Sequence, residues 1–300
     1  MGDAEGVPIA RAPARRLFGG LHLPRRRWGI AVAWAIILGV AGAALLAPLV
    51  APHDPLEQDL ATRLRPGPWG DGGVWGNPLG TDQLGRDLLS RVIHGARLSL
   101  GVGLAAVALA ATAGVGVGLL AGYYRGALDR VLMRLADIQL GMPFLLLAIT
   151  IIAVFGPSIR NLIVVLSLGG WVVYARVVRG QVLSLRERGF IEAARALGTS
   201  DARLLLRHLL PNVMPSVIVL ASFALAQNII LESALSFLGL GAGPRIPSWG
   251  AMLSDSRAYL ATAWWLATVP GLAIMLTVLS INTLGDWLRD ALDPQLRGGP

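Results

Sequence analysis

The chain has 300 residues, of which 54% are hydrophobic and only 15% are charged, whereas an ordinary soluble domain has about 25% charged residues. Its formal net charge is +8, its 26 basic residues are all arginine, and it contains no cysteine. These figures exclude an ordinary soluble domain, a lysine-dependent phosphate loop or Schiff base, and any thiolate metal site or disulfide.

The amino-terminal part predicts a tail followed by a membrane span. Residues 1–27 are rich in arginine, proline and glycine, which is typical of a disordered cytoplasmic tail. The charge-free window that follows is longer than the apolar region of a secretory signal, and residues 47–51 do not form a small-x-small cleavage site. We therefore expect a retained first transmembrane helix at residues 28–50, with a cleaved signal as the alternative.

Residues 51–97 are predicted to form an extracytoplasmic loop. Its first part, residues 51–82, is dense in proline, glycine and aspartate. Between Gln83 and Arg97, leucine, valine and isoleucine recur at helical spacing opposite charged residues. This pattern predicts an amphipathic helix, which either lies on the outer membrane face or packs beneath the loop.

A core of five further transmembrane helices is predicted at residues 98–285, before a cytoplasmic tail at residues 286–300. The charge-free windows, one of them extended past Arg176, are Leu98–Tyr124, Ile138–Ile159, Asn161–Ala175, Leu209–Leu231 and Ala258–Gly285. About 20 apolar residues cross a bilayer, and lipid offers no partner for backbone groups, so these windows must be helical. The predicted fold is all-α, with about six transmembrane helices.

The arginines predict the orientation of these helices. With both termini in the cytoplasm, 18 of the 26 arginines fall on the inner side and 8 on the outer side. The basic charge is therefore explained by membrane topology and lipid contact, without a nucleic-acid partner.

Small and polar residues within the spans predict helix contacts. A small-x-x-x-small face, suited to close helix packing against a partner subunit or within the bundle, is formed by Gly114, Gly118 and Gly122. Polar side chains that would either bond between helices or line a substrate pathway are Gln227, Asn228, Glu232 and Asn282. Glu232 lies near the predicted outer end, where hydration is a further possibility.

The cytoplasmic loop at residues 180–211 is predicted to be a helical hairpin. An apolar stripe at helical spacing consists of Phe190, Ile191, Ala194 and Leu197. Gly198 is a helix stop, and Thr199 or Ser200 can cap a second helix in which Asp201 occupies the first turn. Pro211 is expected to mark the passage into the next span.

The spacing within this loop resembles the EAA loop of ABC importer permeases. The matching residues are Glu192, Ala193 and Ala194, then Gly198, then Leu210 and Pro211, with His208 where the general pattern has isoleucine. The resemblance implies that these six residues couple the chain to a separate ATPase subunit. Two alanines keep one helix face thin, glutamate adds a charged group, and glycine permits a sharp reversal. An inert, solvated hairpin is the alternative.

Other segments resemble the second, C-type permease of dipeptide, oligopeptide and nickel ABC importers. They are residues 80–87, 121–124, 236–241, 247–250 and 285–294. The resemblance implies a type I permease fold in the bacterial inner membrane. It also implies a second homologous permease, two ATP-binding subunits that carry ATP and Mg, and an extracytoplasmic substrate-binding protein.

The resemblance implies a non-catalytic chain, with no cofactor, metal site or catalytic residue of its own. Nickel or glutathione import is the alternative within the family, and a passive channel or scaffold is the alternative of another class. A membrane-embedded hydrolase is disfavoured because the four histidines form no H-E-x-x-H motif and there is no G-x-S-x-G.

Overall fold

The computed structural model describes residues 23–73, 75–243 and 245–292, so most of the predicted amino-terminal tail and residues 293–300 lie outside the described residues. Within these ranges the chain forms helices and no strand, apart from one antiparallel bridge between Thr81 and Asp87. The all-α prediction is confirmed. The helices are α1 (Leu23–Leu45), α2 (Ala47–Val50), η1 (Leu60–Thr62), α3 (Leu88–Tyr124), α4 (Gly126–Leu140), α5 (Phe144–Phe155), α6 (Ile159–Leu185), α7 (Gly189–Ala196), α8 (Asp201–Arg203), η2 (Leu204–Leu209), α9 (Leu210–Phe237), α10 (Trp249–Ser256), η3 (Arg257–Tyr259) and α11 (Trp265–Leu292).

Five helical segments are long and apolar enough to cross a membrane, namely α1, α3, α6, α8 to α9, and α11. A sixth crossing requires α4 and α5 together, and these two helices meet at an angle of 86°. The prediction of one uninterrupted span at Ile138–Ile159 is therefore wrong. Pro143 stands in the break, where it lacks an N–H to continue the helix and disfavours helical geometry at Met142.

The edges of three predicted elements also differ. Helix α1 begins at Leu23 rather than Trp28, because Pro24 is compatible with the first turn of a helix, and α11 continues to Leu292 rather than ending at residue 285. Of the amphipathic helix predicted at residues 83–97, residues 88–97 form the beginning of α3 and residues 83–87 are not helical. The chain turns until Asp87, whose carboxylate accepts a hydrogen bond from the Ser90 N–H at 2.7 Å and caps α3.

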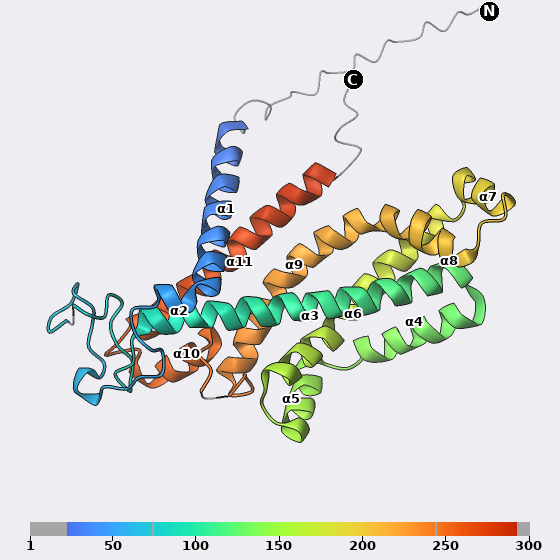
Figure 1. The fold of residues 1–300 in the computed structure, drawn as a ribbon. Coiled ribbons are helices and arrows are strands. Elements are labelled where there is room, and N and C mark those ends of the chain that lie inside the picture. The colour runs from blue at the N-terminus through green and yellow to red at the C-terminus, as the bar shows by residue number, and fades with distance from the viewer. Residues whose placement is uncertain (1–22, 74, 244, 293–300) are drawn as a thin grey trace, which may run out of the picture.

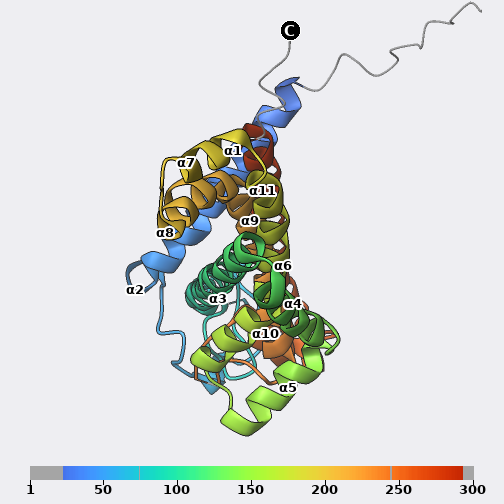
Figure 2. The same cartoon turned by 90° about the vertical axis from the view of Figure 1, so that its right-hand side faces the viewer.

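Helix α3 connects two distinct ends of the molecule. With 37 residues it is about 55 Å long, well beyond the roughly 30 Å hydrocarbon layer. Figure 1 shows α7 and α8 at one of its ends, with residues 51–87 and α10 at the other. We call these the hairpin end and the loop end. Each end has its own buried apolar cluster, and α3 runs alongside α6 for much of its length (Figures 1 and 2).

The passage into α9 is continuous. Residues from Asp201 to Phe237 form one helical segment, and Pro211, which was predicted to mark the passage into the next span, lies in the first turn of α9. A wide π-helical turn at Leu204–Leu209 directly precedes the proline, which cannot donate a hydrogen bond to the preceding turn. A displacement of the hairpin is therefore passed directly to α9.

Candidate functional site

The predicted hairpin is present at residues 189–209. Helix α7 ends at a turn in which the Gly198 N–H bonds the Arg195 carbonyl at 3.0 Å and the Thr199 N–H bonds the Ala194 carbonyl at 3.1 Å. Gly198 has φ +78°, the left-handed geometry that glycine adopts most readily. Ser200 occupies the N-cap position of the second helix, but its side chain makes no capping bond.

The base of the hairpin is fixed to the bundle by apolar side chains. Ile191 of α7 is fully buried together with residues of the π-helical turn, α6 and α9. The cluster that joins these elements includes Val178, Val182, Ile191, Leu204, Leu209 and Val213. The hairpin is therefore a packed part of the fold, and it cannot move independently of α6 and α9 without exposing this cluster.

The predicted apolar stripe divides between two faces. Ile191 and, in part, Ala194 pack inward, whereas Phe190 is exposed and Leu197 has 86% of its surface exposed. The outer part of the hairpin thus presents an apolar contact area that nothing in the described chain covers.

The six predicted coupling residues do not form one surface. Glu192, Ala193 and Gly198 are exposed on the hairpin, and Glu192 makes no ion pair with any described residue. Ala194 is half-buried on the inner side of α7. Leu210 packs against the apolar cluster beneath the hairpin, and Pro211 is exposed beyond the hairpin on α9.

Tyr123 at the end of α3 joins both arms of the hairpin, a role that sequence reasoning missed. Its hydroxyl donates to the Asp201 carboxylate at 2.6 Å and accepts a longer hydrogen bond from Arg195 at 3.5 Å. The Arg195 guanidinium also lies 5.7 Å from the centre of the tyrosine ring, within the range of a cation–π contact. Since Asp201 lies 78 residues away along the chain, no local pattern indicated this contact.

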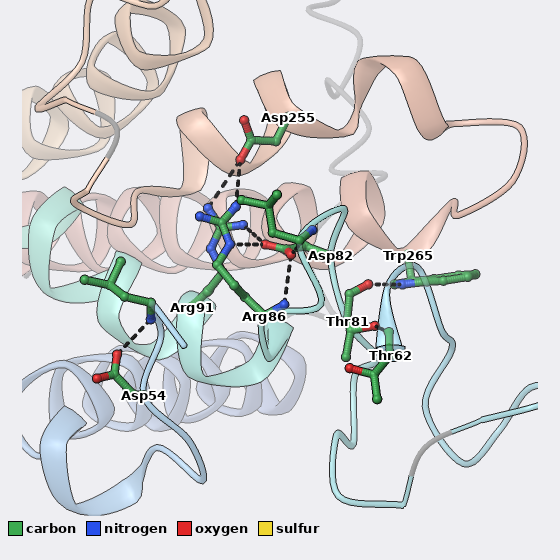
Figure 3. Close-up of polar contacts among 10 residues, drawn as sticks. Asp54, Thr62, Thr81, Asp82, Arg86, Arg91, Asp255 and Trp265 are labelled. Carbon is green, nitrogen blue, oxygen red and sulfur yellow. Dashed lines mark hydrogen bonds and ion pairs between the residues drawn. The ribbon is translucent and has the colours of Figure 1, made fainter. Parts of the chain in front are cut away.

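Polar contacts also fix the loop end (Figure 3). The Asp82 carboxylate accepts from Arg86 Nε at 2.6 Å and from Arg91, and both arginines reach Asp255 of α10 at 3.5 and 3.3 Å. Arg91 is only 4% exposed. The predicted amphipathic segment therefore does not place its charged face in solvent. The segment packs beneath the loop rather than on the outer membrane face, because paired charges can be buried where single charges cannot.

Trp249 connects α10 to α3 at the same end. Its indole Nε1 donates to the Val92 carbonyl at 3.0 Å, and its buried ring lies against Gly95 of α3. Ser248 caps α10 by accepting a hydrogen bond from the Ala251 N–H at 3.1 Å. The segment at residues 247–250 thus contributes a packing contact between two helices.

The three glycines of the predicted small-residue face all lie against α6. A Cβ atom on Gly114 would stand 2.3 Å from the Trp171 carbonyl oxygen. One on Gly118 would stand 2.6 Å from the Ala175 carbonyl oxygen, and one on Gly122 would stand 2.8 Å from the Val182 side chain. In the chain alone, this face is occupied by the internal bundle.

The polar residues of the spans fall into two groups. Glu232 is 0% exposed and accepts hydrogen bonds from Ser99 of α3 at 2.8 Å and Ser236 at 2.7 Å, so a hydrated Glu232 is wrong and an interhelical bond is present. Neither Gln227 nor Asn228 hydrogen-bonds to a described residue, and both line a cavity beside α6. Asn282 is half-buried on α11, away from this cavity.

Comparison with known proteins places the chain among membrane components of importers. Residues 114–298 match the family described as binding-protein-dependent transport system inner membrane component. The di/tripeptide transport system permease protein DppC of Pseudomonas aeruginosa is 45% identical over 85% of this chain and 84% of its own length. The dipeptide transport system permease protein DppC of Escherichia coli K12 is 42% identical over 97% and 96%, respectively.

Two further proteins are similar. The glutathione transport system permease protein GsiD of Pectobacterium atrosepticum is 44% identical over 73% of either chain. A chain of the inward-facing MetNI methionine ABC transporter superposes with a TM-score of 0.57 at 21% identity, over 67% of this chain and 96% of that chain. The solved structure supports the fold, and the sequence matches confirm the resemblance. The chain is a member of the binding-protein-dependent transport system inner membrane component family.

Proposed function

We propose that this chain is a permease subunit of an ATP-driven importer of di- and oligopeptides. It forms the translocation pathway with a second homologous permease, while two separate subunits bind ATP and Mg and hydrolyse the nucleotide. The names of the two DppC relatives support the peptide assignment. The observation that carries the proposal is the exposed hairpin at residues 189–209, whose base is packed into the helices of the bundle.

The hairpin has the properties of a mechanical coupling element. Its outer face offers Leu197, Ala193 and Glu192, which together supply an apolar contact, a thin helix surface and one charge for an ATP-binding subunit. Its inner face is buried against α6 and α9. Displacement of the outer face therefore moves two membrane-crossing helices with it. ATP shifts the conformation only by its different affinity for the two states, so the docked subunits must close differently when ATP is bound.

The proposal also orients the chain in the bacterial inner membrane. The hairpin end, the beginning of α1 and the end of α11 face the cytoplasm in this proposal, in agreement with the distribution of arginines. The loop end then faces outward, where a substrate-binding protein delivers cargo. The ion pairs of Asp82, Arg86 and Arg91 hold that end in a defined shape for such contact.

Glutathione import is the second candidate, favoured by the similarity to GsiD. Glutathione is itself a small peptide-like molecule, so the same pathway chemistry serves both. Nickel import differs from peptide import in its cargo, whereas a passive channel or scaffold differs in needing no ATP. A single uptake experiment therefore separates these alternatives from peptide import.

The experiment is uptake into vesicles that contain the complete complex. Uptake of a radiolabelled dipeptide should require ATP, the ATP-binding subunits and the binding protein. Uptake of glutathione or nickel alone would contradict the peptide assignment. Dipeptide flux that needs no ATP would contradict active import and support a passive channel.

A further inference from the structure

A cavity of about 540 Å³ lies between α5, α6 and α9. This volume falls within the roughly 300–1,000 Å³ typical of small-molecule sites. Tyr174 of α6 is part of its wall, about 22 Å from one end of that helix and about 17 Å from the other by residue count. The cavity is therefore within the membrane-crossing part of the bundle.

Two polar side chains in the cavity wall, Asn228 and Gln227, make no hydrogen bond to any described residue. Asn228 is only 7% exposed, and Gln227, which is exposed, is beside it on α9. Tyr174 contributes to the wall, but its unpartnered hydroxyl has almost no accessible surface and does not open into the cavity. Polar groups at membrane depth are costly when they have no partner. Their presence around one cavity indicates a polar occupant.

The chemistry of the wall identifies the class of occupant. Carboxamide groups offer both donors and acceptors, so the two amides in the wall complement the N–H and C=O groups of a peptide backbone. Phe144 and Phe223 supply apolar surface for side chains. The wall contains no carboxylate, imidazole or thiolate, the groups that bind a metal cation.

A second cavity of about 630 Å³ adjoins the first, since Leu220 and Phe223 line both, and it extends to Asn212 and Arg289. These residues lie toward the hairpin end of α9 and α11. A site on a transport pathway has to bind its cargo weakly enough to release it, and an uncharged wall fits that requirement.

We propose that Asn228 and Gln227 form a transient binding site for the peptide backbone inside the membrane, between delivery at the loop end and release at the hairpin end. This inference rests on the proposed function and adds to it a defined site and its ligand chemistry. The two amides would thereby take part in substrate choice, in addition to any selection by the binding protein.

The test compares a labelled dipeptide with the analogue in which an ester replaces its amide bond. The complete complex is placed in vesicles, and the binding protein is saturated with either compound. The ester lacks the backbone N–H donor. We expect the wild-type complex to import the dipeptide faster, and Asn228→Leu to lower dipeptide uptake by about fivefold, the loss expected for one hydrogen bond.

The ratio of the two rates distinguishes binding from structural damage. Asn228→Leu should bring the dipeptide-to-ester ratio close to one, and Asn228→Gln should restore it. The matched control is Thr277→Val, which removes another buried, unpartnered hydroxyl that lines neither cavity. It should leave both rates unchanged.

Three outcomes overturn the inference: equal wild-type rates for the two compounds, a wild-type ratio of the two rates in Asn228→Leu, or an equal loss of dipeptide uptake in Thr277→Val. In each of these cases ATP-dependent dipeptide import by the wild type would still uphold the proposed function. Absence of dipeptide import by the wild type would instead contradict the proposed function itself.

Discussion

Replacement of Gly198 by valine should weaken the association of the chain with its ATP-binding subunit. A Cβ atom at Gly198 would meet no heavy atom within 4 Å, so the substitution introduces no clash. The cost comes from φ +78°, a geometry that disfavours L-residues by roughly 1–2 kcal/mol. We expect the turn of the free variant to leave the left-handed geometry. Docking to the ATP-binding subunit would have to restore that geometry, and the free energy this costs would lower the affinity. The dissociation constant should rise by about 5- to 30-fold.

The assay is a titration of the purified ATP-binding subunit onto the detergent-solubilised permease. Gly198→Asn should bind nearly as well as the wild type, because asparagine tolerates the left-handed region. Gly189→Val is the control for added bulk, since Gly189 lies in the same hairpin with open space around it and no positive φ. Wild-type affinity of Gly198→Val, or an equal loss in Gly189→Val, would refute the assigned role of the turn.

Three further tests probe contacts at the loop end, between α3 and α6, and beneath the hairpin. Asp82→Ala should lower stability by about 3–5 kcal/mol, because two buried arginines lose their closer, buried carboxylate partner. Asp255→Ala should cost under about 1 kcal/mol, because the Asp255 side chain is 38% exposed and its ion pairs are longer. Equal thermal unfolding shifts of the two variants in detergent would contradict this. Gly118→Ala should lower stability by about 1–3 kcal/mol, because its Cβ atom would clash with α6. Gly116→Ala should leave stability unchanged or raise it, because its Cβ atom would meet nothing within 4 Å. The reverse order in the same unfolding assay would contradict this. Tyr123→Phe should speed amide hydrogen exchange in the hairpin about fivefold, for the loss of about 1 kcal/mol, and unchanged exchange would exclude the hydroxyl as a clamp.

Charge-free windows predicted the membrane helices well, because lipid leaves the backbone no alternative to helix. They failed between residues 138 and 159, where composition is uniformly apolar but Pro143 breaks the chain direction. In the hairpin, Gly198 predicted the turn because its backbone geometry is local. The continuity through Pro211 was missed, because a π-helical turn depends on tertiary packing of the surrounding leucines.

The least predictable features are buried polar groups with distant partners. Arg91 was interpreted as the charged face of an amphipathic helix, since arginine is usually exposed and its partner Asp255 is 164 residues away. Tyr123 and Tyr174 lie in apolar runs and carry no periodic signal. Only the fold brings the former to Asp201 and the latter to the cavity wall beside Asn228.

The most direct test of coupling through the hairpin is site-specific crosslinking, for which the absence of native cysteine makes the chain well suited. A photocrosslinker attached to Ala193→Cys, on the exposed face of α7, should capture the ATP-binding subunit, with a yield that changes between nucleotide-free and ATP-bound states. The same reagent on Ala61→Cys, in the loop at the opposite end, should not capture it. Failure of position 193 to capture the subunit in any nucleotide state of an active complex would contradict the account.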